Sequence, residues 1–245
     1  MNKHLLAGIA LAVGISSAAA DEVSMAFGEK IPPFCFPESN SGIELEVIGE
    51  ALALRGHVLR PKYYSFARVP HAFKLRQVDA AMTDLGEDMT PYGGFYGDPA
   101  VVYDNVFITL AARNLKISRP GELNGLTVVS FQGAVKRYPA WLQPLQRSGR
   151  YVELNDQALQ VRTLNAGRYD VVLSDRHIFR YFSLQLKQQG ISLRPVTEHR
   201  FVTLDPQNYR PVFRSEKIRN DFNAGLRQLK DSGRFQAIYD KYLKE

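Results

Sequence analysis

A short segment that occurs in both halves of the chain constrains the fold most. Residues 78–84 read Val-Asp-Ala-Ala-Met-Thr-Asp, and residues 169–175 read Tyr-Asp-Val-Val-Leu-Ser-Asp. Each copy has an aspartate, three apolar or small residues, a hydroxyl residue and a second aspartate. Each also follows a stretch with helical periodicity and carries the apolar run of a strand. One helix-to-strand unit therefore recurs in each half, which predicts an α/β chain with two related halves.

The residues before the first copy alternate between strand and helix patterns. Residues 23–27 have the alternation of a strand, the stretch after Gly42 has a helical apolar face that ends at Gly56, and residues 57–64 return as a strand. Pro61 predicts that this second strand is short or lies at a sheet edge. Strand-helix-strand units of this kind build an open parallel sheet covered by helices.

The later part of the chain supplies further elements of both kinds. Residues 106–112 and 126–131 are apolar runs of strand length. Apolar residues recur at helical spacing from Ile218 to Leu229 and again from Phe235 to Leu243, with a break at residues 231–233. We expect two amphipathic helices there that face the core.

The first 20 residues have the parts of a secretory signal peptide. A basic start is followed by an apolar run and by Ala18-Ala19-Ala20, so cleavage would leave Asp21 as the N-terminus. The residue directly after that point is not a cysteine that could accept a lipid, and no later segment approaches the length of a membrane span. Cys35 is the single cysteine, so no internal disulfide can form. We expect a soluble periplasmic protein.

Charge and motifs argue against several classes of function. The net charge of +6 comes from scattered basic residues, whereas nucleic-acid binding concentrates them in a stripe. The sequence has no Gly-x-Ser-x-Gly, His-Glu-x-x-His or phosphate-loop motif and no cysteine pair for a metal. We therefore expect no nucleic-acid partner, no catalytic residues, no metal and no cofactor.

The order of short motifs resembles extracellular solute-binding family 3, the polar amino-acid-binding proteins of ABC transporters, of which the chain would be a divergent member. The motifs are residues 32–34 (Pro-Pro-Phe), 42–45 (Gly-Ile-Glu-Leu), 78–81 (Val-Asp-Ala-Ala), 97–99 (Gly-Asp-Pro), 123–128 (Leu-Asn-Gly-Leu-Thr-Val), 132–133 (Gln-Gly), 164–170 (Leu-Asn-Ala-Gly-Arg-Tyr-Asp), 174–175 (Ser-Asp), 229–235 (Leu-Lys-Asp-Ser-Gly-Arg-Phe) and 238–242 (Ile-Tyr-Asp-Lys-Tyr). Each motif is short, and together they span nearly the whole mature chain.

This resemblance implies the type II fold of periplasmic binding proteins. Two α/β lobes, joined by two crossover strands, would close on a ligand held between them. The first lobe would contain residues 21–109 and 210–245, and the second would contain residues 110–209. The resemblance also implies a monomer that captures a small polar, possibly amino-acid-like solute and delivers it to an ABC transporter permease in the inner membrane.

Several residues are candidates to bind the ligand. The resemblance implies that Asp175 pairs with an α-ammonium group and that the backbone N–H groups of Gly133 and Ala134 hold an α-carboxylate. Thr83 and Asp84 follow a strand, and open α/β sheets bind ligands at the carboxyl ends of their strands. Phe34 follows two prolines that fix a turn, which would bring its ring to the rim of the cleft.

The arginine that holds the α-carboxylate in this family is missing. It normally follows a Thr-Pro-Glu-like stretch, but Thr90-Pro91 is followed here by Tyr92-Gly93-Gly94. Arg68 is a substitute, because residues 65–68 resemble a Pro-Trp-x-Arg segment of a divergent branch; alternatively it is a solvent-exposed helix residue.

Asp84 also departs from the family, which more often carries a small hydroxyl residue near this position. Together with Asp175 it would favour a ligand with more than one cationic group. Alternatively, Asp84 caps a turn.

Two other functions remain open. A periplasmic enzyme derived from the same fold, such as a dehydratase, would use Asp84 and Asp175 as general acid and base. A ligand-presenting receptor would serve a sensor or a partner enzyme rather than a transporter.

Overall fold

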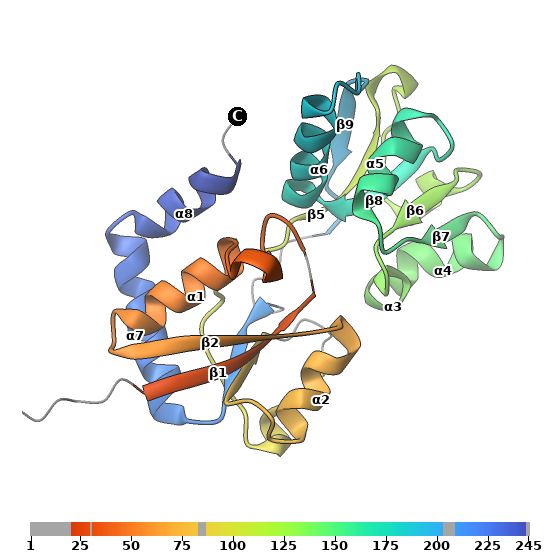
Figure 1. The fold of residues 1–245 in the computed structure, drawn as a ribbon. Helices are drawn as coiled ribbons and strands as arrows, with labels where there is room; N and C mark the ends of the chain where they lie inside the picture. The colour runs from red at the N-terminus through yellow and green to blue at the C-terminus, as the bar shows by residue number, and fades with distance from the viewer. Residues whose placement is uncertain (1–20, 30, 83–86, 203–208, 244–245) are drawn as a thin grey trace, which may run out of the picture.

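The chain forms two lobes, each built on its own sheet (Figure 1). The computed structural model describes residues 21–29, 31–82, 87–202 and 209–243. The expected signal peptide, residues 1–20, lies outside the described residues. None of the described helices is long and apolar enough to span a membrane.

The first lobe has a five-stranded sheet with the order β2-β1-β3-β10-β4. Its strands are β1 (Asp21–Gly28), β2 (His57–Tyr64), β3 (Ala80–Met82), β4 (Phe95–Tyr96) and β10 (Pro211–Phe213). Its helices are α1 (Ile43–Ala53), α2 (Val69–Lys74), α7 (Glu216–Asp231) and α8 (Arg234–Leu243). The apolar side chains of α1, α7 and α8 pack on one face of the sheet and those of α2 on the other. As Pro61 predicts, β2 is an edge strand.

The second lobe repeats this plan with the strand order β7-β6-β8-β5-β9. Its strands are β5 (Asn105–Leu110), β6 (Val128–Ser130), β7 (Tyr151–Glu153), β8 (Val171–Asp175) and β9 (Val196–His199). Its helices are α3 (Ala134–Arg137), α4 (Pro139–Arg147), α5 (Gln157–Asn165) and α6 (Arg176–Gln188). Helices α5 and α6 cover one face, and α3 and α4 cover the other. The α/β class predicted from the sequence is confirmed.

The boundary between the lobes differs from the expected one. Strand β5 pairs with β8 and with β9 in the second sheet, whereas residues up to 109 were expected in the first lobe. All six residues of Asn105–Leu110 are buried, as is typical of a strand that pairs with a neighbour on each side. The chain therefore enters the second sheet at Asn105.

The segment that recurs in the sequence has a structural role in each lobe. The carboxylate of Asp79 accepts hydrogen bonds from the backbone N–H of Ser24 at 2.9 Å and from its hydroxyl at 2.5 Å. Asp170 accepts the same pair from Thr127, at 2.8 and 2.9 Å. Ser24 lies within β1, which pairs in parallel with β3, and Thr127 immediately precedes β6, which pairs in parallel with β8. The first aspartate of each copy thus links two neighbouring parallel strands by hydrogen bonds.

Two glycines allow close packing in the first lobe. A Cβ atom on Gly225 of α7 would lie 1.9 Å from the carbonyl oxygen of Ala51, so the side-chain-free surface lets α7 lie directly on α1. Gly42, with φ of 122°, precedes α1, and a Cβ there would lie 2.3 Å from the carbonyl oxygen of Phe34. Both positions require glycine because backbone atoms occupy the space.

Replacing Asp170 with asparagine should destabilise the second lobe by about 1–2 kcal/mol at neutral pH, because one amide oxygen cannot replace two charge-assisted acceptor sites. Burial opposes ionisation of Asp170, but hydrogen bonds from Thr127 and the charge of Arg113 lower the pKa of this carboxyl below its ordinary value. The stabilisation should therefore be lost as the pH falls below about 4.

Urea unfolding followed by fluorescence measures this effect in the second lobe, because Trp141 on α4 is the only tryptophan of the chain and packs against Phe107 and Phe201. Glu29→Gln, at an exposed position, is the control with an equal loss of charge. A difference between wild type and Asp170→Asn that persists unchanged in acid would contradict the role of the ionised carboxylate.

Candidate functional site

A small cavity lies at the carboxyl ends of the parallel strands of the first lobe. Gly28 and Met82 line it from the ends of β1 and β3, and Glu44 lines it from the first turn of α1. Tyr103 and Tyr209 belong to the two segments that cross between the lobes and close the cavity on that side. Ile31 and Phe66 complete the lining. This is the end of an open α/β sheet at which ligands bind.

Glu44, which lines this cavity, and Asp175, at the end of β8, are both buried carboxylates. Glu44 of the first lobe and Asp175 of the second are each 2% exposed. Burial raises the pKa of the Tyr239 hydroxyl on α8, and the negative charges of Asp175 and Glu44 contribute to this shift. Asp104 is a third buried carboxylate and forms ion pairs with Arg176 and Arg200 at 3.2 and 3.0 Å. Burying a carboxylate costs free energy unless a cation or hydrogen-bond donors compensate it.

Asp175 joins the second sheet to the crossover segment. One carboxylate oxygen accepts the N–H groups of His177 and Ile178 and so caps α6, at 2.9 and 3.0 Å. The other oxygen accepts the N–H of Asp104 at 2.6 Å. Burial, with a contribution from the negative charge of Asp104, raises the pKa of Asp175 to about 7, despite the three N–H donors. An ionised carboxylate has about four acceptor positions, and the protein uses three of them here.

The N-terminus of α3 already holds a carboxylate of the protein itself. Glu153, at the end of β7, accepts the backbone N–H of Gly133 at 2.8 Å and that of Val135 at 3.0 Å. The Tyr151 hydroxyl donates a third hydrogen bond to it at 2.8 Å. The N–H of Ala134 donates to the carbonyl of Phe131 instead. The donors that the resemblance assigns to a ligand carboxylate are therefore occupied by other partners.

The other predicted site residues lie at different distances from the cavity. Phe34 is fully buried behind Tyr103, with ring centroids 4.3 Å apart, and does not line the cavity. The side chain of Arg68 is exposed and forms no hydrogen bond or ion pair with a described residue. Its neighbour Phe66 reaches the cavity instead. Thr83 and Asp84 lie outside the described residues, directly after Met82.

None of the seven residues that line this cavity was among the predicted site residues; the polar ones that were missed are Glu44, Tyr103 and Tyr209. Glu44 had a usable signal, because it lies on the same helical face as Val47 and Ile48, where a charged residue is unusual. No sequence pattern indicated the two tyrosines, because they meet only after the chain has crossed between the lobes twice. Their ring centroids are 4.7 Å apart, and the guanidinium of Arg137 lies 4.5 Å from the Tyr209 ring.

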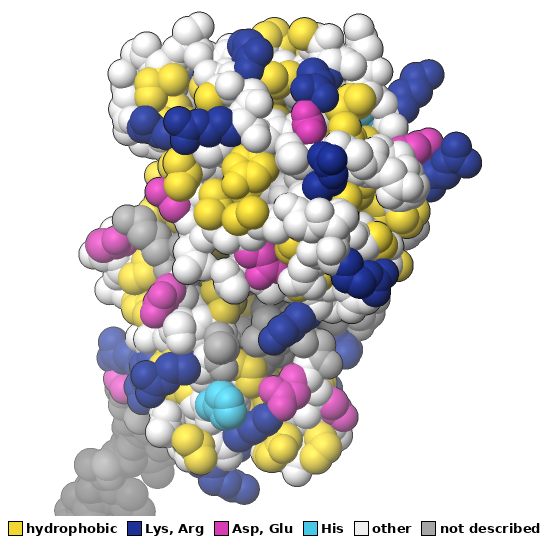
Figure 2. All heavy atoms as spheres, turned by 90° about the vertical axis from the view of Figure 1, so that its right-hand side faces the viewer, with side chains coloured by type: hydrophobic (Ala, Val, Ile, Leu, Met, Phe, Trp, Pro, Cys, Tyr) yellow, Lys and Arg dark blue, Asp and Glu magenta, His cyan; other side chains and the backbone are white. Residues whose placement is uncertain are grey.

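On the face drawn in Figure 2, lysine and arginine side chains are scattered rather than gathered into one patch. Among the described residues, no group of three or more His, Cys, Asp or Glu side chains is arranged to hold a metal ion.

Comparison with family models and with curated proteins finds no match to the sequence. Solved structures do match it over most of its length. The GluR0 ligand-binding core in complex with L-glutamate has a TM-score of 0.71 at 19% identity, covering 93% of this chain and 99% of that one. An arginine transport system periplasmic binding protein from Legionella pneumophila has a TM-score of 0.62 at 15% identity, covering 91% and 100%.

The chain has the fold of the periplasmic binding proteins. A histidine kinase sensor domain with similarity to such proteins also shares it, with a TM-score of 0.67 at 17% identity over 92% of this chain and 97% of that one. These neighbours are binding proteins, a receptor core and a sensor domain, so the fold is one that binds small ligands. The predicted resemblance is confirmed at the level of the fold.

The raised pKa of Asp175 predicts a specific dependence of stability on pH. The folded state binds a proton at this site that the unfolded chain releases near pH 3.9, so stability should fall as the pH rises from about 4 to about 7. Asp175→Asn should lack this contribution, because an amide does not titrate. Urea unfolding across this pH range measures it, with Asp231→Asn, at an exposed position of α7, as the control. Parallel profiles for wild type and Asp175→Asn would contradict the raised pKa.

Proposed function

We propose that this protein is an exported solute-binding protein that holds a small cationic solute between its lobes and delivers it to an ABC importer. The observation that carries the proposal is the pair of buried carboxylates, Glu44 and Asp175, one from each lobe. A cation bound between them would interact favourably with the negative charge of each carboxylate. A solute with two separated cationic groups would interact with both.

Aromatic side chains beside Glu44 support a cationic solute. Phe66 and Tyr103 line the same cavity, and Phe66 is 42% exposed although its ring is large and apolar. Aromatic ring faces attract ammonium and guanidinium groups, more strongly where water is excluded. Carboxylates combined with ring faces thus favour an organic cation over a neutral or anionic solute.

The proposed solute lacks an α-carboxylate. Tyr92-Gly93-Gly94 stands where the family's carboxylate-binding arginine would be, and Glu153 occupies the N–H groups of Gly133 and Val135. A second carboxylate at α3 would meet the negative charge of Glu153 at close range. We therefore place amines and guanidines without a carboxylate above ordinary α-amino acids as ligands.

Delivery to a permease in the inner membrane is supported by neighbours that are transport proteins. The histidine kinase sensor domain among the neighbours supports a second candidate, a receptor that presents its ligand to a sensor. Uptake of the bound solute by cells with and without the gene separates the two: import predicts slower uptake without the gene, whereas a receptor predicts unchanged uptake.

Matched pairs of solutes should distinguish the ligand class. Agmatine is arginine without its carboxylate, and cadaverine and histamine bear the same relation to lysine and histidine. Each amine should raise the melting temperature of the mature chain more than its parent amino acid, because a ligand of the folded state stabilises it by mass action. Tighter binding of the amino acids in calorimetry would overturn the carboxylate-free assignment, while leaving capture between the lobes intact.

Glu44→Gln should weaken the binding of the amine that gives the largest shift by about tenfold, because the amide keeps the shape of the side chain and loses its charge. Asp231→Asn removes one negative charge from the same lobe far from the cavity and serves as the matched control. Equal affinities for the two variants in calorimetry would remove Glu44 from the site.

The affinity for a cation should also depend on pH through Asp175. Protons compete with the cation for this carboxylate below its pKa of about 7, so the affinity should rise as the pH rises towards about 8. In Asp175→Asn this rise should be absent. An amine affinity in the wild type that stays constant from about pH 6 to about pH 8 would show that Asp175 does not contact the cation.

A further inference from the structure

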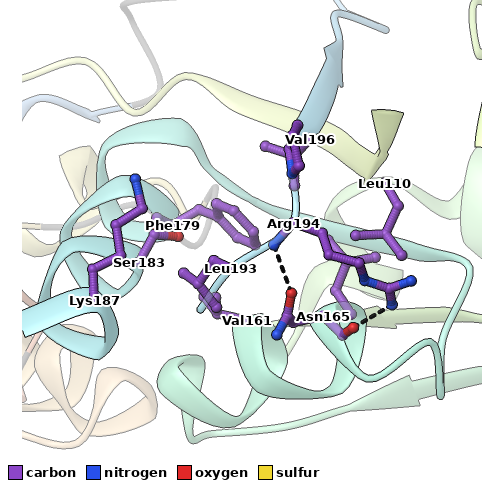
Figure 3. A pocket seen from close by; sticks show the side chains of 11 residues that line it. Leu110, Val161, Asn165, Phe179, Ser183, Lys187, Leu193, Arg194 and Val196 are labelled. Atoms are coloured by element: carbon purple, nitrogen blue, oxygen red, sulfur yellow. Dashed lines mark hydrogen bonds between the residues drawn. The ribbon is translucent and has the colours of Figure 1, made fainter. Parts of the chain in front are cut away.

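The second lobe contains a larger cavity that is separate from the cleft. It has a volume of about 320 Å³ and lies between the end of β5, helices α5 and α6, and the segment that leads into β9 (Figure 3). Leu110, at the carboxyl end of β5, is one wall. Because β5 runs antiparallel to β8, this is the end of the sheet opposite Asp175. A volume of this size is within the range of small-molecule sites.

The wall of this cavity combines an apolar interior with positive charge. Val161, Leu164, Phe179 and Leu193 supply the apolar surface. Lys187 and Arg194 also line the cavity, and no aspartate or glutamate does so. Lys187 is exposed and forms no ion pair with a described residue. The apolar surface would take a hydrocarbon body, and the uncompensated ammonium group would take an anion.

Hydrogen bonds join two walls of this cavity, helix α5 and the segment before β9. The side chain of Asn165, at the end of α5, accepts the backbone N–H of Arg194 at 2.8 Å and donates to the carbonyl of Ser192 at 3.1 Å. The guanidinium of Arg194 donates in turn to the carbonyl of Asn165, as the dashed lines in Figure 3 show. These bonds tie the segment before β9 to α5, so that it cannot collapse onto the apolar wall. Protein interiors rarely leave such a volume unfilled.

We propose that this cavity is a second binding site, which takes a small amphipathic anion with its hydrocarbon part among the apolar side chains and its carboxylate at Lys187. The charge of the cavity is opposite to that of the cleft, so one solute would not suit both. The inference is independent of the cargo proposed above.

Calorimetry with octanoate tests this site in the mature chain. Octanoate should bind saturably at one site, and Lys187→Gln should weaken it by about tenfold, because the neutral amide loses the ionic hydrogen bond. Binding of octanol, which has the same chain and no charge, should be unchanged by Lys187→Gln. Lys116→Gln, at an exposed lysine of the same lobe that does not line the cavity, is the matched control and should bind octanoate like the wild type.

A second variant fills the cavity. Ser183 lines it from α6 and is partly exposed, and its hydroxyl bonds only to the carbonyl of Phe179 in the same helix. Ser183→Phe should therefore fold, as circular dichroism would show, and lose binding of both octanoate and octanol. Octanoate binding should persist in Glu44→Gln, which separates this site from the cleft. Absence of saturable octanoate binding, or equal affinities of Lys187→Gln and Lys116→Gln, would overturn the proposal.

Discussion

The Asp175 carboxylate connects three parts of the second lobe by hydrogen bonds: strand β8, helix α6 and the segment that enters the sheet at Asp104. It ends β8, caps the first turn of α6 and accepts the N–H of Asp104, where the chain enters the second sheet. Because three N–H donors converge on one buried group, the strand, the helix and the crossover keep a fixed relation. The neighbouring His177 then projects from α6 toward the first lobe, where it meets Phe34 and Tyr239 edge-on. The geometry of the contact between the lobes thus depends on this carboxylate.

Two carboxylates of the second lobe accept backbone N–H groups at the starts of helices. Glu153 satisfies the start of α3, as Asp175 satisfies the start of α6. A helix start that is already neutralised by the protein has little attraction left for an anionic ligand group. Glu44, in contrast, stands beside aromatic rings and adds negative charge to the cavity. The charges of the cleft therefore oppose anions and favour cations.

The recurring sequence segment predicted the two-lobed α/β plan, and the periodicities located most of the elements. The role of its first aspartate could not be read from the pattern, because the partners Ser24 and Thr127 lie 55 and 43 residues away. The pairing of Glu153 with Gly133 was hidden for the same reason, since the two elements are adjacent only in the folded sheet. Tyr103 and Tyr209 meet across the crossovers, at positions with no local periodicity. Short-range sequence patterns thus predict the helices and strands, whereas the candidate site consists of contacts between residues that are far apart in the sequence.

Aromatic side chains and two carboxylates both contribute to the interaction between the lobes. Aromatic rings attract between the lobes: Phe36 of the first lobe lies 5.7 Å from Tyr181 of the second, and Tyr239 lies 6.5 Å from His177. Burial lowers the pKa of His177, as does the positive charge of Arg176, so the ring stays neutral against these aromatics. The carboxylates Glu44 and Asp175 carry charges of the same sign on opposite lobes, and both are already buried in this structure. Under the proposed function, a bound cation would reduce the repulsion between these two charges and leave the aromatic contacts in place, and such a differential interaction would favour the closed state.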